Sequence, residues 1–260
     1  MSKAISLLTP VFNRREFLDL MILNVSTQNY PKHLIEWVIL DSYGRNGEIS
    51  QPMLNDAEIA KIKTIIPNIG INYKFVAKAL DIGEKRNMLV KMSRNNICIN
   101  MDSDDIYFEN YVTNIVNELD KPNIQICGSP EMLFVYPLND FKMSFIRCEA
   151  YRQLHEATMG FTKKHFRRMG GFAKTGTGEG AGLFDNCIER YFSKMPIEGL
   201  MCCVAHDTNT CDKTKFINNQ IEASIQGGHR DILERMFITS RLPNQEQMHQ
   251  QQKESEVLEV

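Results

Sequence analysis

The residues of this sequence best suited to chemistry are three acids within four positions: Asp102, Asp104 and Asp105. They directly follow the apolar run NICINM, which is typical of a buried strand. Carboxylates this close repel one another unless a cation or a strong hydrogen-bond donor lies among them. Hard divalent cations such as Mg²⁺ and Mn²⁺ prefer oxygen ligands, often with substrate phosphates completing the shell. We therefore expect a metal at Asp102 and Asp104. The alternative, a solvated acidic loop that caps the next helix, accounts only for Asp105.

Two other acidic motifs fit this cluster less well. An EF-hand loop would need a glycine and alternating acids where Ile106 and Tyr107 stand. A phosphatase of the haloacid dehalogenase type also places Asp-x-Asp after a strand, but near the start of its fold, and here three expected strands precede it. A Mg²⁺-dependent phosphohydrolase with Asp102 as nucleophile is the main enzymatic alternative.

Polar residues also stand where two earlier strands are expected to end. The runs AISLLTPV and IEWVILDS predict strands whose carboxyl ends carry residues 9–13 and Asp41-Ser42. Sheets built mainly from parallel strands bind ligands at these ends. We therefore expect a polar or charged ligand across one edge of the sheet, beside the three acids.

The elements that would position these residues alternate between strands and helices. This alternation predicts an α/β fold with a mostly parallel sheet and helices on both faces. From about residue 140 the chain is richer in glycine, basic and aromatic residues, which indicates a second lobe. We expect one domain over 1–240, with halves 1–138 and 139–240, and a polar tail over 241–260. Further strands are expected at 71–77, 96–102, 123–129, 131–138 and 199–206, and helices at 15–28, 83–95, 107–119 and 183–195.

Charge, cysteine spacing and the opening segment of the sequence exclude several classes of function. The net charge of −2 gives no electrostatic case for nucleic acid or an anionic membrane. The seven cysteines form no CxxC pair, so we expect neither a disulfide framework nor a standard zinc site. The opening segment MSKAISLLTPVFNRREF has too few consecutive apolar residues to span a membrane, and no signal-peptide cleavage site follows it. We expect a soluble, cytoplasmic protein.

Four motifs in order resemble the GT-A glycosyltransferases of the family-2 type. SLLTPVFNRREFL through IEWVILDS resembles their opening, and GEKRN through NICINMDSDD resembles their Arg-Asn helix and Asp-x-Asp strand end. HEATMGFTKKHFRRMGGF resembles their acceptor-side segment. The resemblance covers roughly residues 4 to 210. It implies the GT-A, Rossmann-like fold with a smaller acceptor-side lobe.

The resemblance also implies roles for individual residues. Asp41 would hydrogen-bond the nucleotide base, most simply uracil, and Arg86 would lie near the base or diphosphate, unless it is a surface arginine of its helix. Asp102 would face the ribose and the metal, and Asp104 would ligate Mn²⁺ or Mg²⁺. The remaining nucleotide-binding positions implied are Thr9, Pro10, Phe12, Asn13 and Ser103.

The catalytic base is where the sequence departs from the family. The usual adjacent Glu-Asp after Gly-Gly-Phe is split here between Glu179 and Asp185. An inverting transfer needs one carboxylate within reach of the acceptor hydroxyl. Glu179, in a glycine-rich loop, is slightly favoured. Asp185 could be the base, could orient the acceptor, or could be an acid favoured by the helix dipole.

His206 follows a late strand and resembles the third metal ligand of many GT-A enzymes. A histidine that merely hydrogen-bonds at a strand end is the alternative, and a zinc site with the nearby cysteines matches no standard spacing. These features together predict a metal-dependent transfer of sugar from a nucleotide-diphosphate donor, most simply a UDP-sugar, to a hydroxyl acceptor such as a glycan, with inversion. A non-catalytic module that binds nucleotide-sugar or glycan is the alternative from another class.

Overall fold

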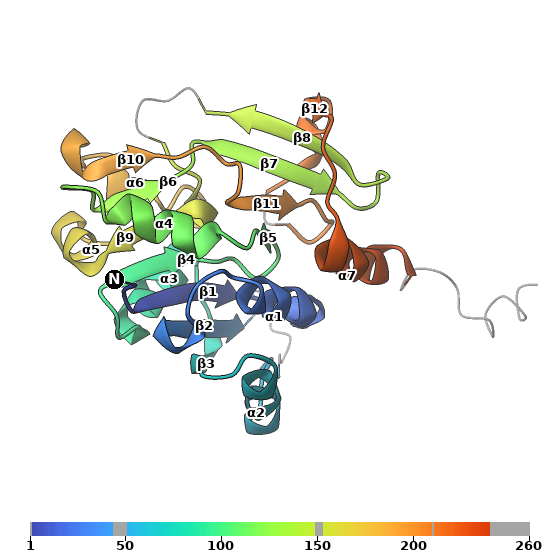
Figure 1. Cartoon of the computed structure of the whole chain (residues 1–260), viewed down its shortest axis with the longest axis horizontal. Coiled ribbons are helices and arrows are strands. Elements are labelled where there is room, and N and C mark those ends of the chain that lie inside the picture. Colours follow the sequence, from blue (N-terminus) through green and yellow to red (C-terminus); the bar gives the residue numbers. More distant parts are fainter. Residues whose placement is uncertain (1, 44–50, 149–152, 210, 240–260) are drawn as a thin grey trace, which may run out of the picture.

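The computed structural model describes residues 2–43, 51–148, 153–209 and 211–239. These residues form two β-sheets with helices packed against them (Figure 1). The expected tail, 241–260, lies outside the described residues.

The first half of the larger sheet is parallel, as the alternation of strands and helices predicts. Its four strands are hydrogen-bonded in register, with Ile5 opposite both Ile35 and Ile97. Two of the four are buried along their whole length, as apolar strands covered on both faces are. The strands are β1 (Ile5–Val11), β2 (Ile35–Tyr43), β3 (Gly70–Ala79) and β4 (Ile97–Asn100).

The second half of this sheet contains its one antiparallel strand. It consists of β6 (Ile126–Gly128), β9 (Gly160–Thr162) and β10 (Phe192–Lys194). The strand order is β10-β6-β9-β4-β1-β2-β3. β9 runs antiparallel to both β4 and β6, whereas β10 is parallel to β6. The sheet is therefore mixed but mostly parallel.

Helices cover both faces of the larger sheet, because successive strand residues point to opposite sides. Leu7 of β1 belongs to one hydrophobic core with residues of α1 and α4, and Leu8 belongs to another with residues of α3 and α6. The helices are α1 (Leu18–Ser26), α2 (Asp56–Ile65), α3 (Ile82–Met92), α4 (Tyr111–Leu119), α5 (Lys163–Met169), α6 (Ala181–Phe184) and α7 (Gly227–Phe237). Single turns of 3₁₀ helix occur at η1 (Arg15–Phe17), η2 (Lys32–Leu34), η3 (Glu156–Thr158), η4 (Glu189–Tyr191) and η5 (Thr214–Phe216).

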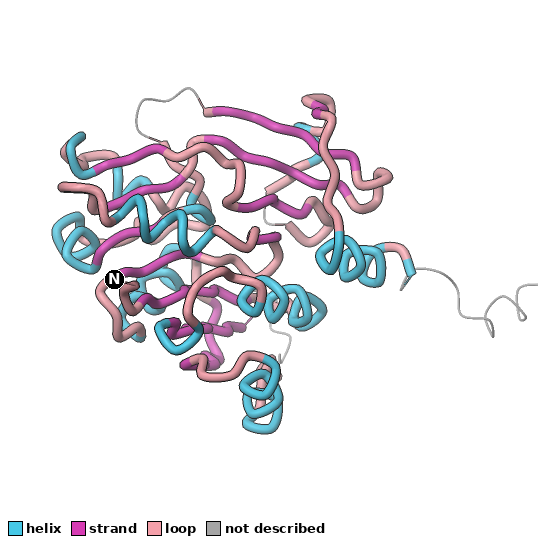
Figure 2. The backbone as a smooth tube through the Cα atoms, in the orientation of Figure 1, coloured by secondary structure: helices cyan, strands magenta, loops and turns pink. Residues whose placement is uncertain are grey.

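The smaller sheet contains strands from both halves of the chain. Its strands are β5 (Ile106–Tyr107), β7 (Glu131–Tyr136), β8 (Lys142–Arg147), β11 (Met201–Val204) and β12 (Gln220–Ile221), in the order β12-β8-β7-β11-β5. They lie beside the larger sheet in Figure 2, with α7 near α1. β5, just after the acidic cluster, pairs with β11, which ends shortly before His206. This pairing joins two stretches about a hundred residues apart.

Two expected elements are wrong or misplaced. The helix expected over 183–195 is only the short α6, because residues 192–194 instead form β10 and pair with β6. Tertiary pairing overrides a helical pattern here. The helix expected from residue 107 begins at Tyr111, because Ile106 and Tyr107 form β5. α2, β8, β9 and α7 were not expected.

Candidate active site

The acidic cluster lies in the turn between β4 and β5, and each acid has its own partners. Asp102 follows β4, and its backbone N–H donates to the Tyr107 hydroxyl at 2.7 Å. Tyr107 and Asp105 are buried, so this side of the turn is held against the interior of the protein. The carboxylates of Asp102 and Asp104 are partly exposed, with about a fifth of each side chain accessible.

Arg86 of α3 joins Asp102 to Glu179. Its two terminal nitrogens donate to the two Asp102 oxygens at 2.8 and 2.9 Å, and its Nε donates to Glu179 Oε1 at 2.8 Å. Burial disfavours the charged guanidinium, but the two carboxylates raise the pKa of Arg86 above its ordinary value. Arg86 is 2% exposed, so it is not a surface arginine of its helix.

Asp104 and His206 meet in space, as the resemblance implied. His206 Nε2 lies 3.3 Å from Asp104 Oδ2, and Arg14 Nε donates to the same oxygen at 3.1 Å. The His206 ring packs against Phe17 and Phe237, at centroid distances of 4.9 and 6.1 Å. Burial raises the pKa of Asp104, but His206, a nearby lysine and Arg14 hold it below its ordinary value.

These two side chains fit two neighbouring positions of a divalent cation. Octahedral ligands about 2.1 Å from Mg²⁺ lie roughly 3 Å apart, close to the Asp104–His206 separation. Nδ1 of His206 is 2.9 Å from Thr208 Oγ1, and Nε2 is 2.6 Å from Asn209 Nδ2. A cation bound at Nε2 would therefore take the place of the Asn209 amide, while the Thr208 contact orients the ring.

Asp102 does not complete a third position in this arrangement, because Arg86 occupies both of its oxygens. Within the described ranges, no group of three or more His, Cys, Asp or Glu side chains is placed to hold a metal ion. The donor set therefore suits a cation that takes its remaining ligands from water or a substrate, as Mg²⁺ usually does.

Asp105 does not cap the following helix. The residue at the N-cap of α4 is Asn110. Asp105 Oδ1 instead accepts from the Val204 backbone at 3.0 Å and from Lys213 Nζ at 3.3 Å. Burial raises the pKa of Asp105 to about 6. Asp105 thus ties the acidic turn to β11, and Lys213 is a charged residue of this region that sequence reasoning missed.

The expected nucleotide-binding residues of β1 divide into two groups. Phe12 and Asn13 are exposed just beyond the strand, and Asn13 has a positive φ of 48°. Thr9 and Pro10 are buried within the strand, where the Thr9 hydroxyl accepts from the indole N–H of Trp37 at 2.9 Å. The structure therefore brings only Phe12 and Asn13 to the surface.

A second missed cation lies beside Phe12. Lys85, the neighbour of Arg86 on α3, places Nζ 4.8 Å from the centre of the Phe12 ring and donates to the Val11 carbonyl at 3.1 Å. The adjacent Lys-Arg pair in the helix GEKRN was the signal that could have identified it.

Asp41 and Ser103 are both about 4% exposed. Asp41 lies near the end of β2, and its Oδ2 accepts from the Met53 backbone and the Tyr73 hydroxyl, each at 2.8 Å. Desolvation and this carboxylate raise the pKa of Tyr73. Asp41 therefore organises the residues beside the end of β2 as well as standing at the expected base position.

The two candidate bases differ in their surroundings. Glu179 is 4% exposed and bound to Arg86, and its carbonyl accepts from the Ala173 backbone at 2.9 Å. Asp185 is exposed and follows the end of α6. The structure thus brings Glu179, but not Asp185, into the cluster around Arg86.

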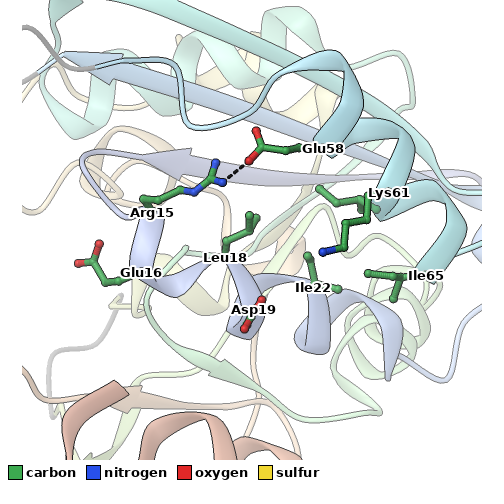
Figure 3. Close-up of a pocket in the computed structure, with 9 residues that line it drawn as sticks. Arg15, Glu16, Leu18, Asp19, Ile22, Glu58, Lys61 and Ile65 are labelled. Atoms are coloured by element: carbon green, nitrogen blue, oxygen red, sulfur yellow. Dashed lines mark hydrogen bonds and ion pairs between the residues drawn. The ribbon is translucent and has the colours of Figure 1, made fainter. Parts of the chain in front are cut away.

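A separate hollow lies between α1 and α2 (Figure 3). It measures about 300 Å³ and is lined by charged and apolar side chains, among them Arg15, Glu58, Lys61 and Ile65. None of the expected site residues lines it.

No helix in the described part of the chain is long and apolar enough to cross a membrane.

Comparisons with known proteins agree with this architecture. The family described as Glycosyl transferase family 2 matches residues 6–192, a stretch that includes the acidic cluster and Glu179 but ends before His206. No curated protein matches the chain.

Three solved structures illustrate the shared fold. The mannosyltransferase PcManGT from Pyrobaculum calidifontis, in complex with GDP-Man and Mn²⁺, has a TM-score of 0.61 at 14% identity over 80% of this chain. TarS 1-349 from S. aureus has a TM-score of 0.56 at 13% identity over 79% of this chain. The complex of TarS 1-349 with UDP-GlcNAc has a TM-score of 0.55 at 12% identity over 91% of this chain. The matches cover 59%, 61% and 71% of those three chains. Since the family match spans well over half of this chain, the protein belongs to glycosyl transferase family 2 and has the GT-A fold.

Proposed function

We propose that this protein transfers a sugar from a nucleotide-diphosphate donor to a hydroxyl acceptor, with Mn²⁺ or Mg²⁺ as cofactor. The observation that supports this most is the meeting of Asp104 and His206 at the end of the parallel strands, beside the ion pair between buried Arg86 and partly exposed Asp102. A family-2 fold with two metal ligands and a buried guanidinium at this edge suits a substrate that carries two phosphates.

Asp104 and His206 would hold the cation, and Asp102 would bind the ribose or join the ligands when Arg86 releases it. A bound cation would supply charge neutralisation for the diphosphate leaving group. Arg14, which now shares Asp104 Oδ2, would turn its guanidinium toward phosphate oxygens, for which its planar fork is suited.

The nucleotide would lie along the ends of β1 and β2. Exposed Phe12 offers an aromatic face and Asn13 offers hydrogen bonds, while Asp41 would accept from the base, which we propose to be uracil. Lys85 stands beside Phe12 and adds positive charge near the diphosphate. Thr9, Pro10 and Ser103, which are buried, would support these contacts from beneath. The two solved relatives named above carry GDP-Man and UDP-GlcNAc, so both nucleotides belong in the test.

We further propose direct displacement at the sugar carbon, with inversion, onto a glycan acceptor. The phosphohydrolase alternative is weakened because both oxygens of its nucleophile, Asp102, are bound by Arg86.

The test is release of UDP from UDP-GlcNAc and of GDP from GDP-Man, with Mn²⁺, Mg²⁺ or EDTA, over a panel of glycan acceptors. We expect release that needs metal and is lost in Asp104→Ala. Asp231→Ala, which changes an exposed acid of α7, is the matched control and should behave as wild type. Metal-dependent binding without any release would instead favour the non-catalytic module.

A further inference from the structure

One carboxylate near Arg86 has no cation of its own. Glu156 is half-buried and forms no ion pair with any other described residue, whereas Asp102 and Glu179 are both bound by the guanidinium. Its carboxylate accepts hydrogen bonds from backbone N–H groups, among them that of Gly180, which donates to Oε1 at 3.2 Å. A base must have a lone pair free for the proton it takes, and a guanidinium-bound carboxylate has less to offer.

The backbone of η3 holds Glu156 rigidly against the strand end that carries the acids. Asn100 Nδ2, at the end of β4, donates to the Glu156 carbonyl at 2.7 Å. The next carbonyl, that of Ala157, accepts from the hydroxyls of Tyr107 and Tyr111 at 3.1 and 3.2 Å. Since Tyr107 also accepts from the backbone of Asp102, Glu156 and the acidic turn share one hydrogen-bond network.

Gly180 leaves the space that the Glu156 carboxylate occupies. A Cβ at position 180 would lie 2.9 Å from both Cγ and Oε1 of Glu156, closer than real Cβ contacts. Glu179 points to Arg86. Because its neighbour Gly180 has no side chain, Glu156 can approach the same loop. The result is two adjacent glutamates with different environments, one paired with a cation and the other not.

The environment of Glu156 also favours its acting as a base. Burial raises the pKa of Glu156, and the nearby Glu179 carboxylate raises it further. A carboxylate with a raised pKa is a stronger base than an ordinary surface glutamate.

We propose that Glu156 is the catalytic base of the transfer described above. As the acceptor oxygen forms its bond to the sugar carbon, its proton passes to the Glu156 carboxylate, and the bond from that carbon to the nucleotide diphosphate breaks with its electron pair leaving on the diphosphate. Glu179 then acts through Arg86 as a positioning residue, and Asp185 lies outside the reaction. This inference rests on the proposed function.

The test compares Glu156→Gln with Asp185→Asn in the nucleotide-release assay, together with calorimetric binding of UDP or GDP in the presence of Mn²⁺. Glutamine keeps the acceptor for Gly180 N–H, so the fold should be retained. We expect Glu156→Gln to lower turnover about a hundredfold or more, with nucleotide affinity within twofold of wild type. Asp185→Asn should keep at least half of the wild-type turnover.

A second variant keeps the carboxylate but moves it. Gly180→Ala places a methyl group against the Phe184 ring and Glu156 Oε1, and should lower turnover at unchanged nucleotide affinity. The inference is overturned if Glu156→Gln retains turnover within threefold of wild type, or if it loses nucleotide binding together with turnover. Wild-type protein that releases no nucleotide from either donor would instead refute the proposed function itself.

Discussion

Arg86 is the buried cation that joins two carboxylates of the candidate site. It is buried and binds Asp102 with both terminal nitrogens and Glu179 with Nε. Removing the cation from such a cluster leaves two carboxylates without compensation, which is costlier than losing an exposed ion pair.

We therefore predict that Arg86→Met lowers the free energy of unfolding by about 3 kcal/mol or more. Arg235→Met, which removes an exposed guanidinium 3.9 Å from Asp19, should cost less than about 1 kcal/mol. Urea denaturation of both variants measures the difference. Equal losses in the two variants would show that the Arg86 cluster does not contribute as its burial suggests.

A second residue-scale prediction concerns acid stability. Burial lowers the pKa of His155 from 6.5 to about 4, and its buried Nδ1 has no hydrogen-bond partner among the described residues. The unfolded chain therefore binds a proton between pH 6.5 and 4 that the folded protein resists, so stability falls as the pH drops through this window. We expect the wild type to lose about 3 kcal/mol more than His155→Gln between pH 7 and 4. Parallel pH curves for the two proteins would contradict this.

At the scale of elements, α7 is the support of His206. Phe237 near its end packs against both the His206 ring and Phe17, at centroid distances of 6.1 and 6.2 Å. Groups that orient a metal ligand affect metal affinity without touching the metal. We predict that Phe237→Ala weakens Mn²⁺ binding in the presence of UDP about tenfold, whereas Phe237→Leu has a smaller effect. Unchanged Mn²⁺ affinity in Phe237→Ala would separate α7 from the site.

The contact between α3 and the glycine-rich loop is another element-scale feature. A Cβ at Gly83 would lie 1.8 Å from the Ala173 carbonyl oxygen, whereas one at Gly228 of α7 would lie 3.3 Å from a leucine side chain. Gly83→Ala should therefore cost about 1–3 kcal/mol in the free energy of unfolding. Gly228→Ala should change it by less than half as much. Thermal unfolding distinguishes the two, and equal melting temperatures would contradict the close approach.

At the scale of the whole molecule, the sequence predicted the elements that bury long apolar runs. β1, β2 and β4, with α1 and α3, followed from local periodicity, because each buries apolar residues of one segment. β9 and β10 could not be predicted in the same way, because three-residue strands are defined by their partners.

The residues of the candidate site could likewise be predicted only in part from the sequence. Strand ends identified Asp102 and Asp104, and the resemblance identified His206, which the structure places beside Asp104. The sequence could not reveal that Arg86 binds Asp102 and Glu179, or that Glu156 contacts Gly180, since these contacts join segments tens of residues apart. The pairing of β5 with β11 that brings His206 to Asp104 is likewise a property of the complete fold.

The central claim is metal-dependent binding of a nucleotide diphosphate through Asp104 and His206. Calorimetric titration of UDP and GDP, with Mn²⁺ and with EDTA, tests it on the wild type, Asp104→Ala, His206→Ala and the control Asp231→Ala. We predict binding of at least one nucleotide that needs Mn²⁺, falls tenfold or more in the first two variants, and is unchanged in the control. Binding that is equally tight in EDTA, or unaffected by loss of the Asp104 carboxylate, would contradict the claim.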